Sequence, residues 1–288
     1  MKCEGSVPGI WKCRDRRIDL GTRPRVMGIL NVTPDSFSDG GRHDQIESAV
    51  AFGLGMVADG ADVLDVGGES TRPGSLPVPV AVEKERVIPV IRELARQVDV
   101  PISVDTTKAE VASAAIAVGA VIVNDISSLT MDPGMMSVVR ESGAGVVLMH
   151  MKGMPRIMQD APVYDQVVDD VARYLDARVK DSIRAGIDAD CLVVDPGIGF
   201  GKTVKHNLEL LGSLRVLGER TGRPVLVGLS RKRFIGVVTG MEVDQRLAGS
   251  LAGLIYSLFQ GVRVFRVHDV PESRQALALI EAIQGCSA

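Results

Sequence analysis

"PISVDTTKAEVASAAIAVGAVIVNDIS" (residues 101–127) contains two short apolar runs, 101–107 and 121–127, separated by a helical pattern at 108–118. Both runs are nearly continuously hydrophobic inside, which is typical of strands that are covered on both faces. A strand, a helix and a second such strand predict one crossover unit of a parallel sheet. The fold therefore depends on how often this unit recurs.

The same alternation extends over the whole chain. Further apolar runs lie at 25–31, 62–68, 145–151, 191–197, 224–230 and 261–269. Helical patterns separate them, at 45–59, 81–97, 132–142, 165–183, 205–220, 246–259 and 272–284. Eight strands alternating with helices in about 250 residues predict a closed (β/α)8 TIM barrel. The alternative is a doubly wound open sheet, which shares this local pattern.

The N-terminal segment departs from the alternation. "GIWKCRDRRIDLGTRP" (9–24) alternates polar and apolar residues and predicts a small β-hairpin that plugs the N-terminal mouth of the barrel. No linker-like stretch divides the chain. We therefore predict a single-domain α/β protein, with residues 1–24 as a hairpin that caps the barrel bottom and residues 25–288 as the barrel.

Composition excludes several classes of function. The 288 residues carry a net charge of −3, so there is no basic field to attract nucleic acid or a membrane surface. Only 3% of the residues are aromatic, too few for base-stacking platforms. The four cysteines lack metal-ligand spacing, and no apolar run approaches membrane-spanning length. A cytoplasmic protein is expected.

The carboxyl ends of the predicted strands are polar throughout. In barrel enzymes the reaction site lies at these ends. A single Asp after a strand is more often a helix N-cap than a catalyst, but eight polar exits are hard to assign to capping alone. The pattern indicates a binding or catalytic surface at the C-terminal mouth.

Three of these residues form a donor and acceptor set. Asp105, Asn124 and Asp195 end three of the predicted strands. A carboxylate accepts two hydrogen bonds side by side, which suits a ligand edge with adjacent N–H groups, such as a 2-aminopyrimidinone. Lys232, just beyond the seventh strand, can hold a carbonyl oxygen or an anionic group by charge-assisted bonding.

The last strand carries a basic pair. Arg266 and His268 are two residues apart and so point to one face, which the pattern shares with Val262 and Val264. An Arg–His pair aimed at a cavity suggests an anionic group, and the planar fork of Arg suits phosphate. The alternative is that both side chains are satisfied at a helix interface.

A glycine-rich loop resembles a phosphate loop but does not match it. "DPGIGFGKT" (195–203) has three residues between Gly197 and Gly201, where the nucleotide-triphosphate motif requires four. We reject that site. We expect the glycines instead to let the backbone turn closely around a ligand held by Asp195.

With these residues in view, the chain resembles the dihydropteroate synthase family from Val26 to Val270. The motifs that carry the resemblance are "MGILNVTPDSFSDGG", "DVGGESTRPG", "SVDT", "NDIS", "MH", "DPGIGFGKT", "SRKRFIG" and "FRVHDV", in this order. The resemblance implies a homodimeric (β/α)8 transferase of folate synthesis and a sulfonamide target. Such an enzyme joins 4-aminobenzoate to 6-hydroxymethyl-7,8-dihydropterin diphosphate, releasing pyrophosphate and forming 7,8-dihydropteroate.

The resemblance also implies a role for particular residues. The pterin would be held by Asp105, Asn124, Ile126, Met149, Asp195, Phe200 and Lys232. The diphosphate would be bound by Asn31, Arg266 and His268, with Asn31 acting through Mg²⁺. The 4-aminobenzoate would meet Phe37, Thr71, Arg72, Pro73 and Arg233. The catalytic set would be Asp39, Lys232, Arg266 and His268.

The implied chemistry fits these residue types. Pyrophosphate leaves easily when Mg²⁺, Arg and His neutralise its charge. The aniline nitrogen is a competent nucleophile, so no activated Ser or Cys is needed. Asp39 would stabilise the positive charge that develops at the pterin methylene, and the loop that bears it would act as a lid. Arg233 departs from the Ser that many family members carry there, so sulfonamide sensitivity stays open.

Two other functions share much of this pattern. A pterin-binding methyltransferase acting between methyltetrahydrofolate and a corrinoid would keep the Asp and Asn residues, but it needs neither "ESTRPG" nor the Arg–x–His pair. A paralogue that binds pterin without condensing it is the second alternative. The sequence favours the synthase because every matched catalytic position is intact.

Overall fold

The computed structural model describes residues 9–33, 42–70, 74–153, 158 and 162–286. The strands are β1 (Ile10–Cys13), β2 (Arg16–Asp19), β3 (Arg25–Asn31), β4 (Val63–Gly67), β5 (Ile102–Asp105), β6 (Ile122–Asp125), β7 (Gly145–Met149), β8 (Leu192–Asp195), β9 (Leu226–Val227) and β10 (Val264–Val267). The α-helices are α1 (Arg42–Ala58), α2 (Val80–Gln97), α3 (Ala109–Ala117), α4 (Met135–Ser142), α5 (Val167–Arg184), α6 (Val204–Leu211), α7 (Leu214–Thr221), α8 (Arg233–Thr239), α9 (Leu247–Phe259) and α10 (Val270–Cys286).

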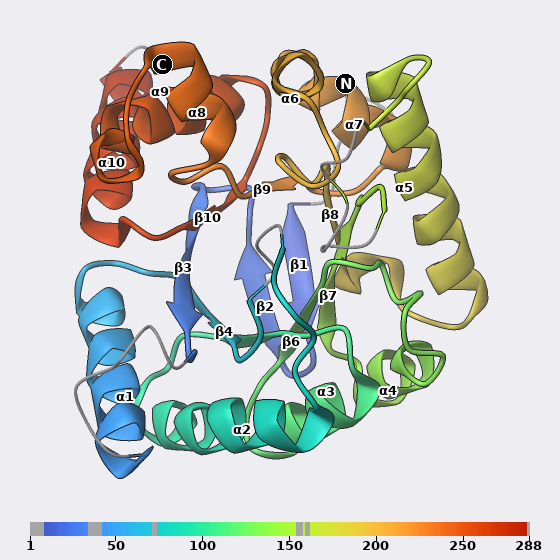
Figure 1. Cartoon of the computed structure of the whole chain (residues 1–288), viewed down its shortest axis with the longest axis vertical. Coiled ribbons are helices and arrows are strands. Elements are labelled where there is room, and N and C mark those ends of the chain that lie inside the picture. The colour runs from blue at the N-terminus through green and yellow to red at the C-terminus, as the bar shows by residue number, and fades with distance from the viewer. Residues whose placement is uncertain (1–8, 34–41, 71–73, 154–157, 159–161, 287–288) are drawn as a thin grey trace.

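The strands from β3 to β10 form one parallel sheet in the order β8-β7-β6-β5-β4-β3-β10-β9. A parallel bridge between Val194 and Val225 joins the two outer strands, so the sheet closes on itself. The helices surround this ring (Figure 1). The predicted TIM barrel is therefore confirmed, and the open doubly wound sheet is excluded.

The seventh barrel strand is shorter than the apolar run at 224–230 indicates. β9 covers only Leu226–Val227, and the chain already turns at Arg231, whose φ is 57°. Pro224 begins the run and has no N–H to donate, although its carbonyl accepts the Val194 N–H at 3.0 Å. A hydrophobic run thus predicts the position of this strand better than its length.

The helical patterns need two corrections. The predicted helix at 205–220 is split into α6 and α7 around Gly212 and Ser213, and glycine is a poor helix former. The short helix α8 lies between β9 and α9 at a place where the periodicity predicts no helix. Only Phe234 and Ile235 are buried in α8, too few residues to give a periodic signal.

The N-terminal hairpin fills one end of the barrel (Figure 1). Trp11 and Cys13 are fully buried, and the Trp11 Nε1–H donates to the carbonyl of Cys191 at 2.8 Å. These side chains join inward-facing residues of the strands, among them Val264, in one cluster. A Cβ on Gly145 would lie 2.5 Å from the Cys13 Sγ, so only glycine leaves room there. The predicted hairpin is confirmed.

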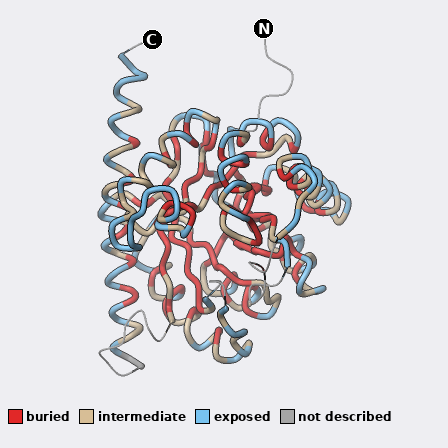
Figure 2. The backbone as a smooth tube through the Cα atoms, turned by 45° about the horizontal axis from the view of Figure 1, so that its top comes forward, coloured by how far each residue is buried: buried red, intermediate tan, exposed pale blue. Residues whose placement is uncertain are grey.

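A second, larger cluster lies between the strands and the helices, and Figure 2 shows buried residues concentrated in the strands. Val262 belongs to this outer cluster, so its predicted place on one face with Val264 is wrong. It precedes β10, where strand alternation does not yet apply. Within the described ranges, no helix combines the length and hydrophobicity needed to cross a membrane.

Candidate active site

Four polar or small residues stand level at the carboxyl ends of neighbouring strands. In the parallel ladders Asn31 pairs with Gly67, Gly67 with Asp105, and Asp105 with Asn124. Across the barrel, Met149 pairs with Asp195. Register therefore places Asn31, Asp105 and Asn124 on one rim, and it places Met149 and Asp195 side by side at the carboxyl ends of two further strands.

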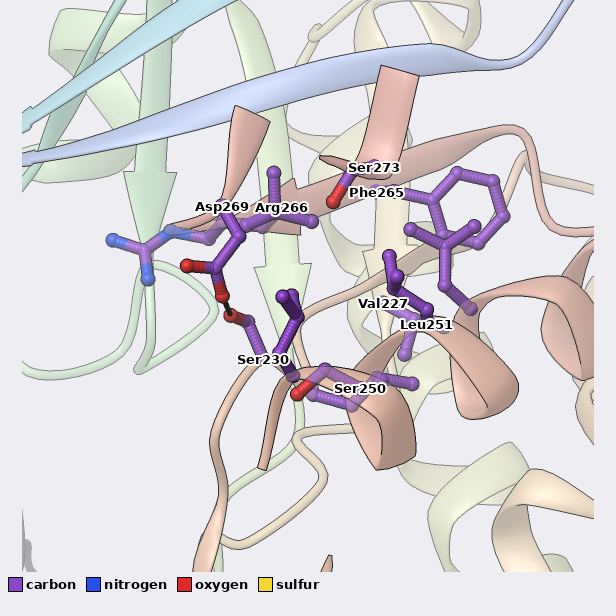
Figure 3. Close-up of a pocket in the computed structure, with 12 residues that line it drawn as sticks. Val227, Ser230, Ser250, Leu251, Phe265, Arg266, Asp269 and Ser273 are labelled. Atoms are coloured by element: carbon purple, nitrogen blue, oxygen red, sulfur yellow. Dashed lines mark hydrogen bonds between the residues drawn. The ribbon is translucent and has the colours of Figure 1, made fainter. Parts of the chain in front are cut away.

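Arg266 crosses this rim from β10. Its Nε–H donates to Asp65 Oδ2 at 2.6 Å and its Nη2–H donates to Asp105 Oδ2 at 2.7 Å. Figure 3 shows the guanidinium directed away from the apolar side chains of Val227, Leu251 and Phe265. The predicted inward orientation is confirmed, and a helix-interface role for Arg266 is excluded.

Burial and the charges around Arg266 shift two pKa values. Burial raises the pKa of Asp105 to about 7, with Asp65 adding to the shift and Arg266 opposing it. Burial would lower the pKa of Arg266, but Asp65 and Asp105 outweigh that effect and raise it. One guanidinium cannot fully compensate two buried carboxylates, so Asp105 binds a proton or a hydrogen-bond donor readily.

Lys232 and Asp195 form the second charged group of the rim. The Lys232 Nζ donates to the carbonyl of Ile198 and lies 4.7 Å from the centroid of the Phe200 ring. Burial lowers the pKa of Lys232 to about 8, and Asp195 opposes that shift. Burial raises the pKa of Asp195, while Lys232 and the Gly197 N–H at 2.7 Å hold it down. The predicted grouping of Asp195, Phe200 and Lys232 is thus present.

The glycines of the 195–203 loop serve a different neighbour from the one predicted. Gly197 has φ +65°, and a Cβ there would lie 1.9 Å from the carbonyl oxygen of His150. Gly201 has φ +61°, and its Cβ would lie 2.2 Å from the carbonyl oxygen of Lys152. The close approach is to the chain's own backbone after β7. The loop is therefore fixed against that backbone, and the expectation that the glycines make room for a ligand is not supported.

Substituting one of these glycines separates the clash from backbone strain. Gly197→Ala should cost roughly 3 kcal/mol or more of unfolding free energy, because left-handed strain adds to overpacking. Gly222→Ala is the matched control, with φ +62° and nothing within 4 Å of the added Cβ, and it should cost roughly 1–2 kcal/mol. Urea denaturation of both variants measures the difference. Equal losses would show that the loop does not depend on this contact.

A buried lysine adds to this fixation. Lys202 Nζ lies 3.0 Å from His150 Nδ1 and donates to the carbonyl of Phe200 at 3.0 Å. Burial, and next the charge of Lys202, lower the pKa of His150 far below its ordinary value. His150 therefore stays neutral and accepts from Lys202, which makes it a loop anchor rather than a residue of the rim.

His268 is held from the neighbouring strand exit. Its Nδ1 lies 3.2 Å from Ser230 Oγ, and its backbone N–H donates to the same oxygen at 3.3 Å. Ser230 in turn donates to Asp269 at 3.5 Å (Figure 3), and Asp269 pairs with Arg231. Since Ser230 contacts Nδ1, the serine helps to orient the ring of His268.

The other predicted site residues differ in placement. Ile126 and Met149 are buried, Asn31 is half-buried, and Arg233 begins α8 with an exposed side chain. Phe37, Asp39, Thr71, Arg72 and Pro73 lie outside the described residues, so their predicted roles stay predictions.

Mg²⁺ was predicted at Asn31, and the donor set there is small. Among the residues that the structure describes, no group of three or more His, Cys, Asp or Glu side chains could hold a metal ion. Mg²⁺ is commonly bound by one or two protein oxygens plus substrate phosphates. The amide oxygen of Asn31 fits an ion that arrives with a diphosphate.

Comparison with known proteins identifies the family. The family model described as pterin binding enzyme matches residues 27–268. Dihydropteroate synthase of Escherichia coli strain K12 is 47% identical over 265 residues, covering 92% of this chain and 93% of that protein. The chain belongs to the dihydropteroate synthase family.

Solved structures of the family share the fold. The Xanthomonas albilineans dihydropteroate synthase with 4-aminobenzoic acid matches with a TM-score of 0.90 and 50% identity, covering 96% of this chain and 98% of that one. The Yersinia pestis dihydropteroate synthase in a sulfonamide drug complex matches with a TM-score of 0.89 and 42% identity, covering 96% and 99%. The predicted family and barrel are both confirmed, and the methyltransferase alternative is not favoured.

Two features of the site were missed from the sequence. Asp65 lies under Arg266 and bonds to it, and only strict alternation within "DVLDVGG" signals that it faces inward. Lys108 donates to both Glu69 and the buried Glu83, which ties the connection after β4 to α2. No local sequence pattern indicates that second contact.

Proposed function

We propose that this chain condenses 6-hydroxymethyl-7,8-dihydropterin diphosphate with 4-aminobenzoate, giving 7,8-dihydropteroate and pyrophosphate. The observation that carries the proposal is the rim on which Asp105, Asn124 and Arg266 meet, since it combines acceptors for N–H groups with a cation for phosphate. Relatives of high identity that bear the name of this activity support it.

The pterin would lie on the rim between its two charged groups. Asp105 and Asp195 would accept N–H groups of the pterin ring, and Lys232 would donate to its carbonyl oxygen. Met149, Ile126 and Phe200 would supply apolar contact with the ring. A site built this way rejects ligands that lack the matching N–H groups, because its buried acceptors would lose their partners.

The diphosphate would lie toward Arg266 and His268. The charge of Arg266 and a hydrogen bond from the His268 ring would stabilise the negative charge that builds on the leaving pyrophosphate as the C–O bond breaks. Bound Mg²⁺, held through Asn31 and the phosphate oxygens, would neutralise further charge on that group. The aniline nitrogen of 4-aminobenzoate would then form the new C–N bond and lose a proton. We propose that Asp39 stabilises the positive charge that develops at the pterin methylene. We propose that the aminobenzoate is contacted by Phe37, Thr71, Arg72, Pro73 and Arg233.

Turnover and metal dependence are tested together. Purified protein with the dihydropterin diphosphate, Mg²⁺ and 4-aminobenzoate should release pyrophosphate, and release should require the aminobenzoate. Excess EDTA should lower the rate at least about tenfold, as expected when a metal stabilises the leaving group, and added Mg²⁺ should restore it. Pterin binding without release would select the non-catalytic paralogue, and full activity in EDTA would remove the metal from the proposal.

We also propose a homodimer that uses the surface of α8, α9 and the connection between them. Large apolar side chains are half or more exposed there, namely Val237, Val238, Val243, Tyr256 and Phe259. Large exposed apolar side chains on two elements that pack together are typical of an interface between protein chains. Sedimentation equilibrium should give twice the chain mass of 30.7 kDa. Val238→Asp together with Phe259→Asp should shift the mass toward the monomer.

A further inference from the structure

Asp65 is a fully buried carboxylate that none of the predicted site sets includes. It lies on β4 at 0% exposure, level with Ser103 and two residues before Gly67. Gly67 is level with Asp105 and Asn124, so Asp65 stands one layer deeper in the barrel than they do. A ligand on the rim would therefore not touch Asp65.

A single oxygen of Asp65 receives hydrogen bonds from two rim residues. Its Oδ2 accepts the Arg266 Nε–H at 2.6 Å and an Asn124 Nδ2–H at 3.0 Å. Since this oxygen accepts both bonds, Asn124 turns the NH₂ end of its amide toward Asp65. The carbonyl end of Asn124 is then the end that lies away from Asp65.

The same oxygen helps to fix Arg266. The guanidinium is planar, and its Nε–H and Nη2–H are bound by two carboxylates on different strands, Asp65 on β4 and Asp105 on β5. Two anchors fix the plane of the group, whereas Asp105 alone would leave it free to pivot. Asp105 is also the anchor that a bound pterin would compete for.

We propose that Asp65 is a positioning residue that selects which end of the Asn124 amide faces the pterin and fixes the plane of Arg266. The proposal rests on the proposed function. It implies that Asn124 presents an acceptor to the rim and therefore recognises an N–H group of the ring. Through Arg266, Asp65 also supports the departure of pyrophosphate.

The test uses Asp65→Asn and Asp65→Ser, the second being a smaller side chain in case the isosteric amide disturbs folding. Either change should raise the KM for the dihydropterin diphosphate about 10- to 100-fold, the usual effect of removing a partner that orients a binding residue. kcat should fall about tenfold through Arg266, and the KM for 4-aminobenzoate should stay within about threefold. Ser103→Ala, in the same layer and without a hydrogen-bond partner among the described residues, should change none of the three.

A double-mutant cycle with Asn124→Ala identifies the path of the effect. In the Asn124→Ala background, Asp65→Asn should change the KM for the dihydropterin less than about threefold, while its effect on kcat should persist. If Asn124→Ala removes the effect of Asp65→Asn on KM but not on kcat, Asp65 acts on KM through Asn124. Its effect on kcat is then assigned to Arg266. A merely structural role would change both KM values together and would be additive with Asn124→Ala.

The outcomes separate this inference from the function on which it rests. Wild-type protein that releases pyrophosphate, while the Asp65 variants keep a normal KM for the dihydropterin, overturns the role of Asp65 alone. Additive effects in the cycle overturn it as well. Wild-type protein without aminobenzoate-dependent release overturns the proposed function and this inference together.

Discussion

Asp105→Asn should lower kcat/KM for the dihydropterin diphosphate by about four orders of magnitude, which is the scale on which a site built for hydrogen-bonded groups discriminates. The substitution keeps the size of the side chain but removes its charge and one of its two acceptor oxygens. The one remaining oxygen can accept from Arg266, which now donates at 2.7 Å, or from the pterin ring, but the NH₂ end can accept from neither. Steady-state kinetics with the dihydropterin varied at saturating 4-aminobenzoate measures the loss.

Asp125→Asn is the matched control for this variant. Asp125 is a buried carboxylate on the neighbouring strand, but it points to the other face and accepts from the Ser127 and Leu129 N–H groups. Its loss should reduce stability and leave the KM for the dihydropterin within about threefold, because no rim contact is removed. A similar loss of kcat/KM in both variants would show that the effect of Asp105 is structural.

The difference in unfolding free energy between the wild type and Asp105→Asn should depend on pH. Burial raises the folded-state pKa of Asp105 from 3.8 to about 7, so between these values the folded protein keeps a proton that the unfolded chain has released. The residue therefore contributes stability at low pH that is lost as pH rises from about 4 to 7. The unfolding free energy of the wild type, relative to the variant, should fall across this window. A flat difference would contradict a raised pKa.

Trp11→Ala should cost about 3–5 kcal/mol of unfolding free energy, the range for truncating a fully buried large aromatic side chain. This is a large fraction of the total stability of a typical domain, about 5–15 kcal/mol. Trp11 is fully buried in the end of the barrel opposite the rim. Activity per folded molecule should therefore change little. Circular dichroism is the suitable probe, since Trp11 is the only tryptophan of the chain.

Trp11→Phe is the control that keeps most of the apolar volume. It removes the hydrogen bond to the Cys191 carbonyl and should cost about 1–2 kcal/mol. A loss below about 1 kcal/mol in Trp11→Ala would show that the hairpin contributes little to the closed end of the barrel. A large loss of turnover in folded Trp11→Ala protein would show that the two ends are coupled.

Hydrophobic alternation predicted the barrel because each strand is covered on both faces and each helix on one. It did so for β5, α3 and β6, where the predicted ranges 101–107, 108–118 and 121–127 each contain the observed element. Polar residues at the strand ends predicted the rim, because parallel strands bring their carboxyl ends to one side. Asp105 and Arg266 are bonded there although 161 positions separate them.

What the sequence did not predict depends on contacts between distant segments. Strand alternation can show that Asp65 faces inward, but only the structure shows that its partner is Arg266. The glycines at 197 and 201 signal a close approach, but only the structure gives the partner, the backbone at His150 and Lys152. The early end of β9 depends on pairing with β10, which a hydrophobic run does not encode.

The pairing between strands is weakest where β8 meets β9. Among the described residues, Val194 and Val225 form the one isolated bridge, and it lies at this junction. The barrel can open at this junction with a lower free energy than elsewhere, because fewer backbone hydrogen bonds must break. Asp195 ends β8 on one side of this junction, and Lys232 follows β9 on the other side. A ligand bound to both residues would connect the two strands, so ligand binding should also stabilise this junction against opening.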